Sequence, residues 1–117
     1  MRRHNYYGRD TARVPTSTKN LNHQPFIIKV DTVTGETKSW WDKDCYPSEP
    51  IFVPSPQAKE EDEGVVLSAL VSGADECEVC LLLLDARELR ERARAYFRTP
   101  SPAPKCLHGW FLPASRE

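Results

Sequence analysis

From residue 26 onward, short apolar runs alternate with turn residues. Residues 26–30 and 36–41 are rich in β-branched and aromatic side chains, and the segment between them contains Gly35. Two such runs joined by a short glycine-containing turn predict a β-hairpin. Residues 51–53 form another apolar run that is closed by Pro54, and they predict a third short strand.

The second half of the chain begins with an acidic run at 59–63, for which we expect a solvated, charged turn. Residues 65–71 and 79–84 are apolar without strict alternation, which predicts two strands that are covered on both faces. After them, residues 85–89 are suited to a helical turn with Asp85 as its N-cap. Residues 93–97 continue this helix or form a further strand.

Residues 1–25 are basic and polar and have no apolar period. Such a composition buries too little surface to offset the cost of ordering, so we expect an irregular or disordered N-terminal segment before a folded region at 26–117. Short strands with turns about every ten residues predict an all-β meander, and sandwiches, barrels and propeller blades all fit this spacing. The open strand edges indicate part of a larger fold.

The composition of the 117 residues restricts the function. A net charge of −1 excludes a global electrostatic attraction to nucleic acid, so no nucleic-acid partner is expected. No apolar run approaches the ~18 to 20 residues that span a bilayer. The basic N-terminus lacks the apolar stretch of a signal peptide. We therefore expect a cytoplasmic protein whose four cysteines are thiols.

Four residues have a spacing that suggests a metal site. Cys77 and Cys80 form a CxxC pair, and Cys106 and His108 follow as CxH. Three thiolates and one imidazole are suited to tetrahedral zinc, which would make the chain a small zinc-stabilised binding module. The alternative is that these cysteines are ordinary thiols, as we expect for Cys45.

Two further residues are candidates for chemistry. His108 lies among apolar and aromatic residues, so it is either a buried histidine that bonds a backbone carbonyl or a metal-binding or catalytic residue. Glu49 stands between Ser48 and Pro50 at the head of an apolar strand. It is either an exposed turn acid or a buried carboxylate, which would need a partner.

Several motifs in one order resemble a known family. Residues 46–54 contain the sequence YPSEPIFVP, and 60–68 follow with an acidic run, a glycine and an apolar strand. Residues 82–89 have the pattern LxLDAxxL, and 107–111 end in a histidine-glycine motif. Over about residues 26–113, the chain resembles the C-terminal region of the carotenoid oxygenases, and it is most similar to the insect isomerooxygenase branch.

The resemblance implies the C-terminal part of a seven-bladed β-propeller, with iron(II) held on the propeller axis by four histidines. It implies that His108 is the last iron ligand, and that Glu49 is a glutamate behind the ligands that orients His108 or a neighbour. In this family the iron and O2 cleave a polyene double bond into carbonyl products such as retinoids, and some members also isomerise a double bond. The implied partners are a carotenoid and O2, with peripheral membrane association of the full-length protein.

The resemblance also implies an incomplete enzyme. His4 and His23 match none of the ligand motifs, and most of the propeller and of the substrate tunnel has no counterpart in these residues. We therefore expect a C-terminal fragment of a carotenoid oxygenase, from a partial gene model or a truncated isoform, that is not catalytic alone. One alternative is a fragment that derives from the family but serves no catalytic function, such as a pseudoenzyme product. The other is the zinc-stabilised module.

Overall fold

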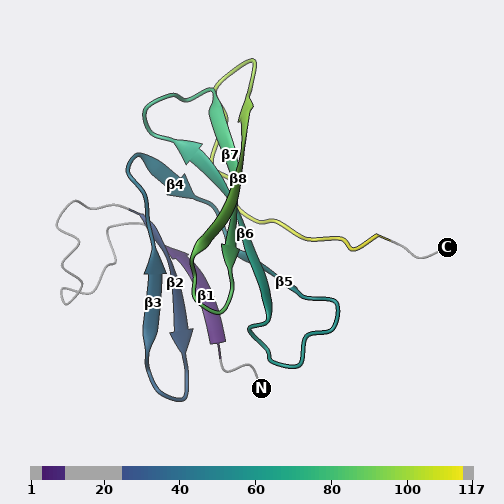
Figure 1. Cartoon of the computed structure of the whole chain (residues 1–117). Helices are drawn as coiled ribbons and strands as arrows, with labels where there is room; N and C mark the ends of the chain where they lie inside the picture. Colours follow the sequence, from purple (N-terminus) through teal and green to yellow (C-terminus); the bar gives the residue numbers. More distant parts are fainter. Residues whose placement is uncertain (1–3, 10–24, 115–117) are drawn as a thin grey trace.

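The protein is all-β in the residues that the computed structural model describes, which are 4–9 and 25–114, with side chains from Pro25 onward. These residues form two antiparallel sheets, and they contain no helix of the length and hydropathy that a membrane crossing requires (Figure 1). The strands are β1 (His4–Arg9), β2 (Phe26–Asp31), β3 (Thr37–Trp40), β4 (Cys45–Pro47), β5 (Ile51–Pro54), β6 (Gly64–Ser72), β7 (Glu78–Asp85) and β8 (Glu91–Arg98).

The first sheet has the order β1-β2-β3, and its β2–β3 hairpin confirms the predicted one. In the turn, the carboxylate of Asp31 accepts the N–H groups of Val33 and Thr34 at 2.9 and 3.2 Å. Gly35 closes the turn with its N–H 2.8 Å from the carbonyl oxygen of Asp31. Its φ of 75° lies in the left-handed region, where glycine carries no steric penalty.

The prediction of an irregular segment at 1–25 is wrong for β1. This strand pairs with β2 along its whole length, from His4 opposite Asp31 to Arg9 opposite Phe26. The free edge of β2 supplies the backbone partners that order β1, and a short polar sequence does not reveal such tertiary pairing. Residues 10–24 lie outside the described part of the chain.

The second sheet has the order β4-β6-β7-β8, and β5 pairs with β6 beyond the end of β4. The predicted strands at 51–53, 65–71 and 79–84 are confirmed, whereas β4 was not predicted. After β7 the chain makes a turn, in which the Glu88 N–H donates to the Asp85 carboxylate at 2.9 Å. Leu89 has a φ of 56°, which ends the turn, and β8 follows as a strand.

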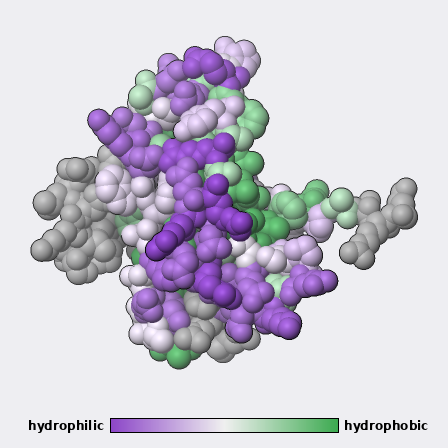
Figure 2. Space-filling view, in the orientation of Figure 1, coloured by the Kyte–Doolittle hydropathy of each residue, from purple (hydrophilic) through white to green (hydrophobic). Residues whose placement is uncertain are grey.

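The core lies between the two sheets. Val66 and Leu70 of β6 and Leu82 of β7 are buried on one face, and they belong to the same cluster as Ile27 of β2 and Trp40 of β3. The intervening residues of β6 and β7 are only half-buried. The prediction that both faces are covered is therefore wrong for the described residues, because the first sheet covers one face only. Figure 2 shows hydrophobic surface that continues from the body of the molecule onto the C-terminal segment.

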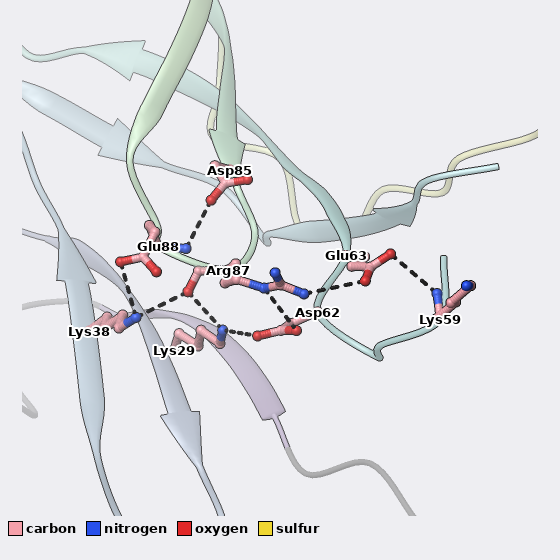
Figure 3. Close-up of polar contacts among 8 residues, drawn as sticks. All are labelled: Lys29, Lys38, Lys59, Asp62, Glu63, Asp85, Arg87 and Glu88. Carbon is pink, nitrogen blue, oxygen red and sulfur yellow. Dashed lines mark hydrogen bonds and ion pairs between the residues drawn. The ribbon is translucent and has the colours of Figure 1, made fainter. Parts of the chain in front are cut away.

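A buried ammonium group joins the two sheets (Figure 3). Lys29 of β2 is 5% exposed, and its Nζ lies 2.8 Å from the Asp62 carboxylate and 2.9 Å from the carbonyl oxygen of Arg87. The Arg87 guanidinium lies 3.6 Å from Asp62 and 3.4 Å from Glu63. The acidic run at 59–63 is therefore not the fully solvated turn that we expected, because Asp62 is drawn inward to neutralise Lys29.

Replacing Lys29 by Met should lower the free energy of unfolding by about 3 kcal/mol, because it removes the ammonium group that lies 2.8 Å from the largely buried Asp62 carboxylate. We place the loss at the lower end for a buried pair because Arg87 still faces Asp62. Urea unfolding of the purified protein measures this loss.

The matched control is Lys38→Met. Lys38 pairs with Glu88 at 3.4 Å, and both side chains are at least one-third exposed, so we expect a loss of about 1 kcal/mol or less. Equal losses in the two variants would contradict a special role for the buried pair.

Candidate functional site

Two residues that are 59 positions apart in the sequence meet at the candidate site. Glu49 lies on the linker between β4 and β5, and His108 lies on the segment that follows β8. The Nδ1 atom of His108 is 3.1 Å from Oε2 of Glu49. Both side chains are exposed on this chain, by 87% for His108 and 44% for Glu49. The interpretation of His108 as a buried histidine that bonds a backbone carbonyl is therefore wrong, and Glu49 has a defined partner.

The same carboxylate oxygen of Glu49 also accepts the N–H of Gly109 at 3.3 Å. The hydrogen bond from His108 lowers the pKa of Glu49 below its usual value, and the Gly109 N–H lowers it further. Glu49 is therefore ionised at neutral pH and acts only as an acceptor.

An acceptor at Glu49 determines which nitrogen of the His108 ring carries the proton. The ionised carboxylate requires the N–H at Nδ1, so a neutral His108 has its lone pair at Nε2. None of the described residues bonds to Nε2. A histidine with Nδ1–H on a carboxylate and a free, accessible Nε2 is the usual arrangement of a metal-binding imidazole. His108 thus fits the role of one ligand to a metal ion.

Backbone hydrogen bonds fix the path of the C-terminal segment from β8 to this site. The Thr99 N–H donates to the carbonyl oxygen of Cys77 at 2.8 Å. The Ala103 N–H donates to the carbonyl oxygen of Glu76 at 3.0 Å. The segment thus crosses the start of β7 and turns back toward the β4–β5 linker, although its prolines prevent it from joining a sheet.

The structure does not assemble the four-residue zinc site. The described residues contain no group of three or more His, Cys, Asp or Glu side chains that could hold a metal ion. Cys80 is buried within β7, Cys77 is half-buried just before that strand, and Cys106 is exposed. Cys77 therefore lies in the turn before the strand, and Cys77 and Cys80 are not part of any group of three such side chains in the described residues.

Sequence reasoning missed two serines near the pair. Ser48 and Ser68 are both buried, and the Ser68 hydroxyl donates to the carbonyl oxygen of Ser48 at 2.8 Å. The available signals were the place of Ser48 between Pro47 and Glu49, and the polar Ser68 inside an otherwise apolar strand. A polar residue at a core position needs a partner, and here the partner is the linker that carries Glu49.

Comparison with known proteins gives consistent matches. Residues 1–113 match the protein family described as retinal pigment epithelial membrane protein, RPE65. A carotenoid isomerooxygenase of Galleria mellonella is 70% identical over an alignment of 90 residues that covers 74% of this chain. The carotenoid isomerooxygenase of Drosophila melanogaster is 48% identical over 88 residues, and the human beta,beta-carotene 15,15'-dioxygenase is 51% identical over 86.

The fold also matches solved structures. A crystal structure of an ACO/RPE65 chimera superposes with a TM-score of 0.70 and 29% sequence identity, covering 90% of this chain and 22% of that chain. The matched regions make up only 18%, 14% and 15% of the moth, fly and human relatives. The chain therefore spans a small part of the length of the proteins that it resembles.

Removing the Glu49 carboxylate should change the tautomer of His108. In the unmodified protein at a pH where the ring is neutral, we expect the proton mainly on Nδ1. In Glu49→Ala, this preference should be lost, because no carboxylate then accepts the Nδ1 proton. Two-dimensional proton–nitrogen NMR of the imidazole ring distinguishes the two tautomers.

The control is Glu60→Ala, which removes an exposed glutamate from the loop before β6 and should leave the His108 tautomer unchanged. If the imidazole spectrum of Glu49→Ala matches that of the unmodified protein, Glu49 does not control this ring.

Proposed function

The chain belongs to the RPE65/carotenoid oxygenase family, and from this premise we propose that it forms part of a non-haem iron(II)-dependent carotenoid oxygenase. In this proposal His108 is one iron ligand and Glu49 orients it. The observation that supports it most strongly is the 3.1 Å contact between Glu49 and Nδ1 of His108, which leaves Nε2 available.

The residues present suit iron(II) in their chemistry. A neutral imidazole is a good ligand for this ion, and a carboxylate that accepts its other N–H increases its strength as a donor. The ionised Glu49 also places a negative charge behind the ligand, where it offsets part of the metal's charge. Among the residues whose side chains the structure describes, His108 is one such histidine, and this proposal assigns the remaining ligands to other parts of the full-length protein.

We propose that the two sheets are part of a seven-bladed β-propeller that this chain does not complete. The antiparallel all-β fold and its likeness to an ACO/RPE65 chimera support this arrangement. The half-buried outer faces of β6 and β7 also support it, because further layers of the full-length protein would cover them. The exposed apolar residues of the C-terminal segment would be covered in the same way; they are Leu107, Trp110, Phe111 and Leu112.

The proposed reaction is the oxidative cleavage of a carotenoid double bond by O2, in which each carbon of the bond receives one oxygen atom and two carbonyl products form. Bound iron(II) would supply the electrons that activate O2. The part of this chain is to hold the His108 ring in one orientation, with its proton kept at Nδ1 by Glu49. Proteins named carotenoid isomerooxygenase and carotene dioxygenase among the relatives support this substrate class.

The proposal extends to the place of the full-length protein in the cell. Cytoplasmic location agrees with the four cysteines, all of which are free thiols in the structure. An apolar polyene partitions into lipid, so we propose that the full-length protein associates peripherally with a membrane to reach its substrate.

Replacing His108 by Ala in the full-length protein should remove bound iron and cleavage activity, because it removes a metal ligand. Metal analysis of the purified protein and an assay of carotenoid cleavage measure the two effects. A His108→Ala protein with normal iron content would contradict the assignment.

Two cysteine variants serve as controls and test the rival zinc site. Cys77→Ser and Cys106→Ser should both retain iron, because neither thiol belongs to a group of three or more metal-binding side chains in the described residues. Loss of metal in either variant would instead favour a site that contains cysteine.

Glu49→Gln should preserve the fold and weaken iron binding about 10- to 100-fold, which is the usual effect of losing a partner behind a metal ligand. Titration of the metal-free protein with iron(II) under anaerobic conditions measures the affinity. An unchanged affinity would show that Glu49 is only a turn residue.

A further inference from the structure

Ser48 makes more hydrogen bonds than its place in a short linker requires. Its N–H donates to the carbonyl oxygen of Ala69 at 2.8 Å, and its own carbonyl oxygen accepts the Ser68 hydroxyl at 2.8 Å. Both of these partners belong to β6, and Ser48 itself is 4% exposed. The backbone of Ser48 is therefore bonded to β6 through both its N–H and its carbonyl oxygen, and these two bonds fix the position from which its hydroxyl group projects.

That hydroxyl oxygen accepts the N–H of Cys106, on the C-terminal segment, at 3.3 Å. The next contacts continue in order, because Glu49 accepts from His108 and Gly109. Gly109 also packs closely on Ile51, since an added Cβ at Gly109 would lie 2.6 Å from the Ile51 side chain. The segment therefore follows the linker, and Ser48 makes the first of these contacts.

We propose that Ser48 is a positioning residue for His108, because it fixes the C-terminal segment two residues before the histidine. This inference rests on the proposed function, in which His108 binds iron. The preceding backbone-to-backbone hydrogen bond of the segment in the described residues comes from Ala103. Because the Cys106 hydrogen bond fixes the backbone two residues before His108, fewer residues remain to be ordered when the imidazole contacts Glu49 and the metal.

This restriction matters because the Glu49–His108 contact is exposed on this chain. An exposed contact between a carboxylate and an imidazole contributes little to stability, so it cannot by itself hold a long loose segment in one geometry. A hydrogen bond to a buried, fixed hydroxyl restricts the segment beforehand and reduces the ordering cost of metal binding. Ser48 acts on the histidine through the backbone of Cys106, and it touches neither the imidazole nor the metal.

The test is Ser48→Ala in the full-length protein, with two measurements. Hydrogen exchange of the Cys106 and Gly109 amides should become about 3- to 10-fold faster, while the amides of β6 and β7 keep their protection. The dissociation constant for iron(II), measured anaerobically, should rise by a similar factor of about 3 to 10.

The matched control is Ser101→Ala, on the same C-terminal segment. Ser101 is exposed, and it is its backbone carbonyl that accepts a hydrogen bond, from the Thr99 hydroxyl at 2.6 Å. We expect no change in amide exchange or in iron affinity for this variant.

Three results would overturn the inference. In the unmodified protein, a Cys106 amide that exchanges at the unprotected rate would show that the hydrogen bond is absent, and this needs no variant. A loss of protection throughout β6 and β7 in Ser48→Ala would show a general structural role. Iron affinity that falls in His108→Ala but not in Ser48→Ala would remove the positioning role. If His108→Ala also retains iron, the proposed function itself fails, and the amide measurements then report only on the segment.

Discussion

The arrangement of the two sheets depends on the neutralisation of one buried ammonium group. Lys29 projects from β2 into the space between the sheets, where an unpaired charge would be strongly unfavourable. Asp62, from the loop before β6, and the carbonyl oxygen of Arg87, from the turn after β7, meet this requirement. Because those two segments belong to the second sheet, the ion pair and its hydrogen bond restrict how the sheets pack, and Ile27 and Trp40 then fill the apolar core.

The candidate site depends on β6, which also contributes core residues to the packing of the two sheets. β4 and β5 both pair with β6, so the linker that carries Glu49 is held at both ends. The C-terminal segment approaches that linker from β8 and places His108 on the carboxylate. One half of the pair is therefore built on a sheet, and the other half is delivered by a segment without regular structure. This division explains why the contacts at the linker matter for the geometry of the histidine.

Much of this arrangement was predictable from the sequence, for identifiable reasons. The strands at 51–53 and 65–71 and the hairpin around Gly35 follow from local patterns, and the structure confirms them. Glu49 and His108 were candidates from their sequence context, and the resemblance implied their roles. Their contact depends on the path of the C-terminal segment, which local patterns do not reveal. Pairing of β1 was missed because it depends on the edge of β2.

The burial or exposure of individual side chains was harder to predict from the sequence than the positions of the strands. Lys29 lies in an apolar run, where its neighbours predict a strand but not which charge neutralises it. Asp62 looks like any other acid of its run, and only the tertiary fold distinguishes it from Glu60. The exposure of His108 could not be predicted either, because its apolar neighbours Leu107 and Trp110 are themselves exposed on this chain. The most direct test of the account is a crystal structure of the iron-loaded full-length protein, with the metal located by anomalous scattering. The account predicts iron at Nε2 of His108, with Nδ1 still hydrogen-bonded to Glu49. Iron bound at Nδ1, or located away from His108, would contradict it.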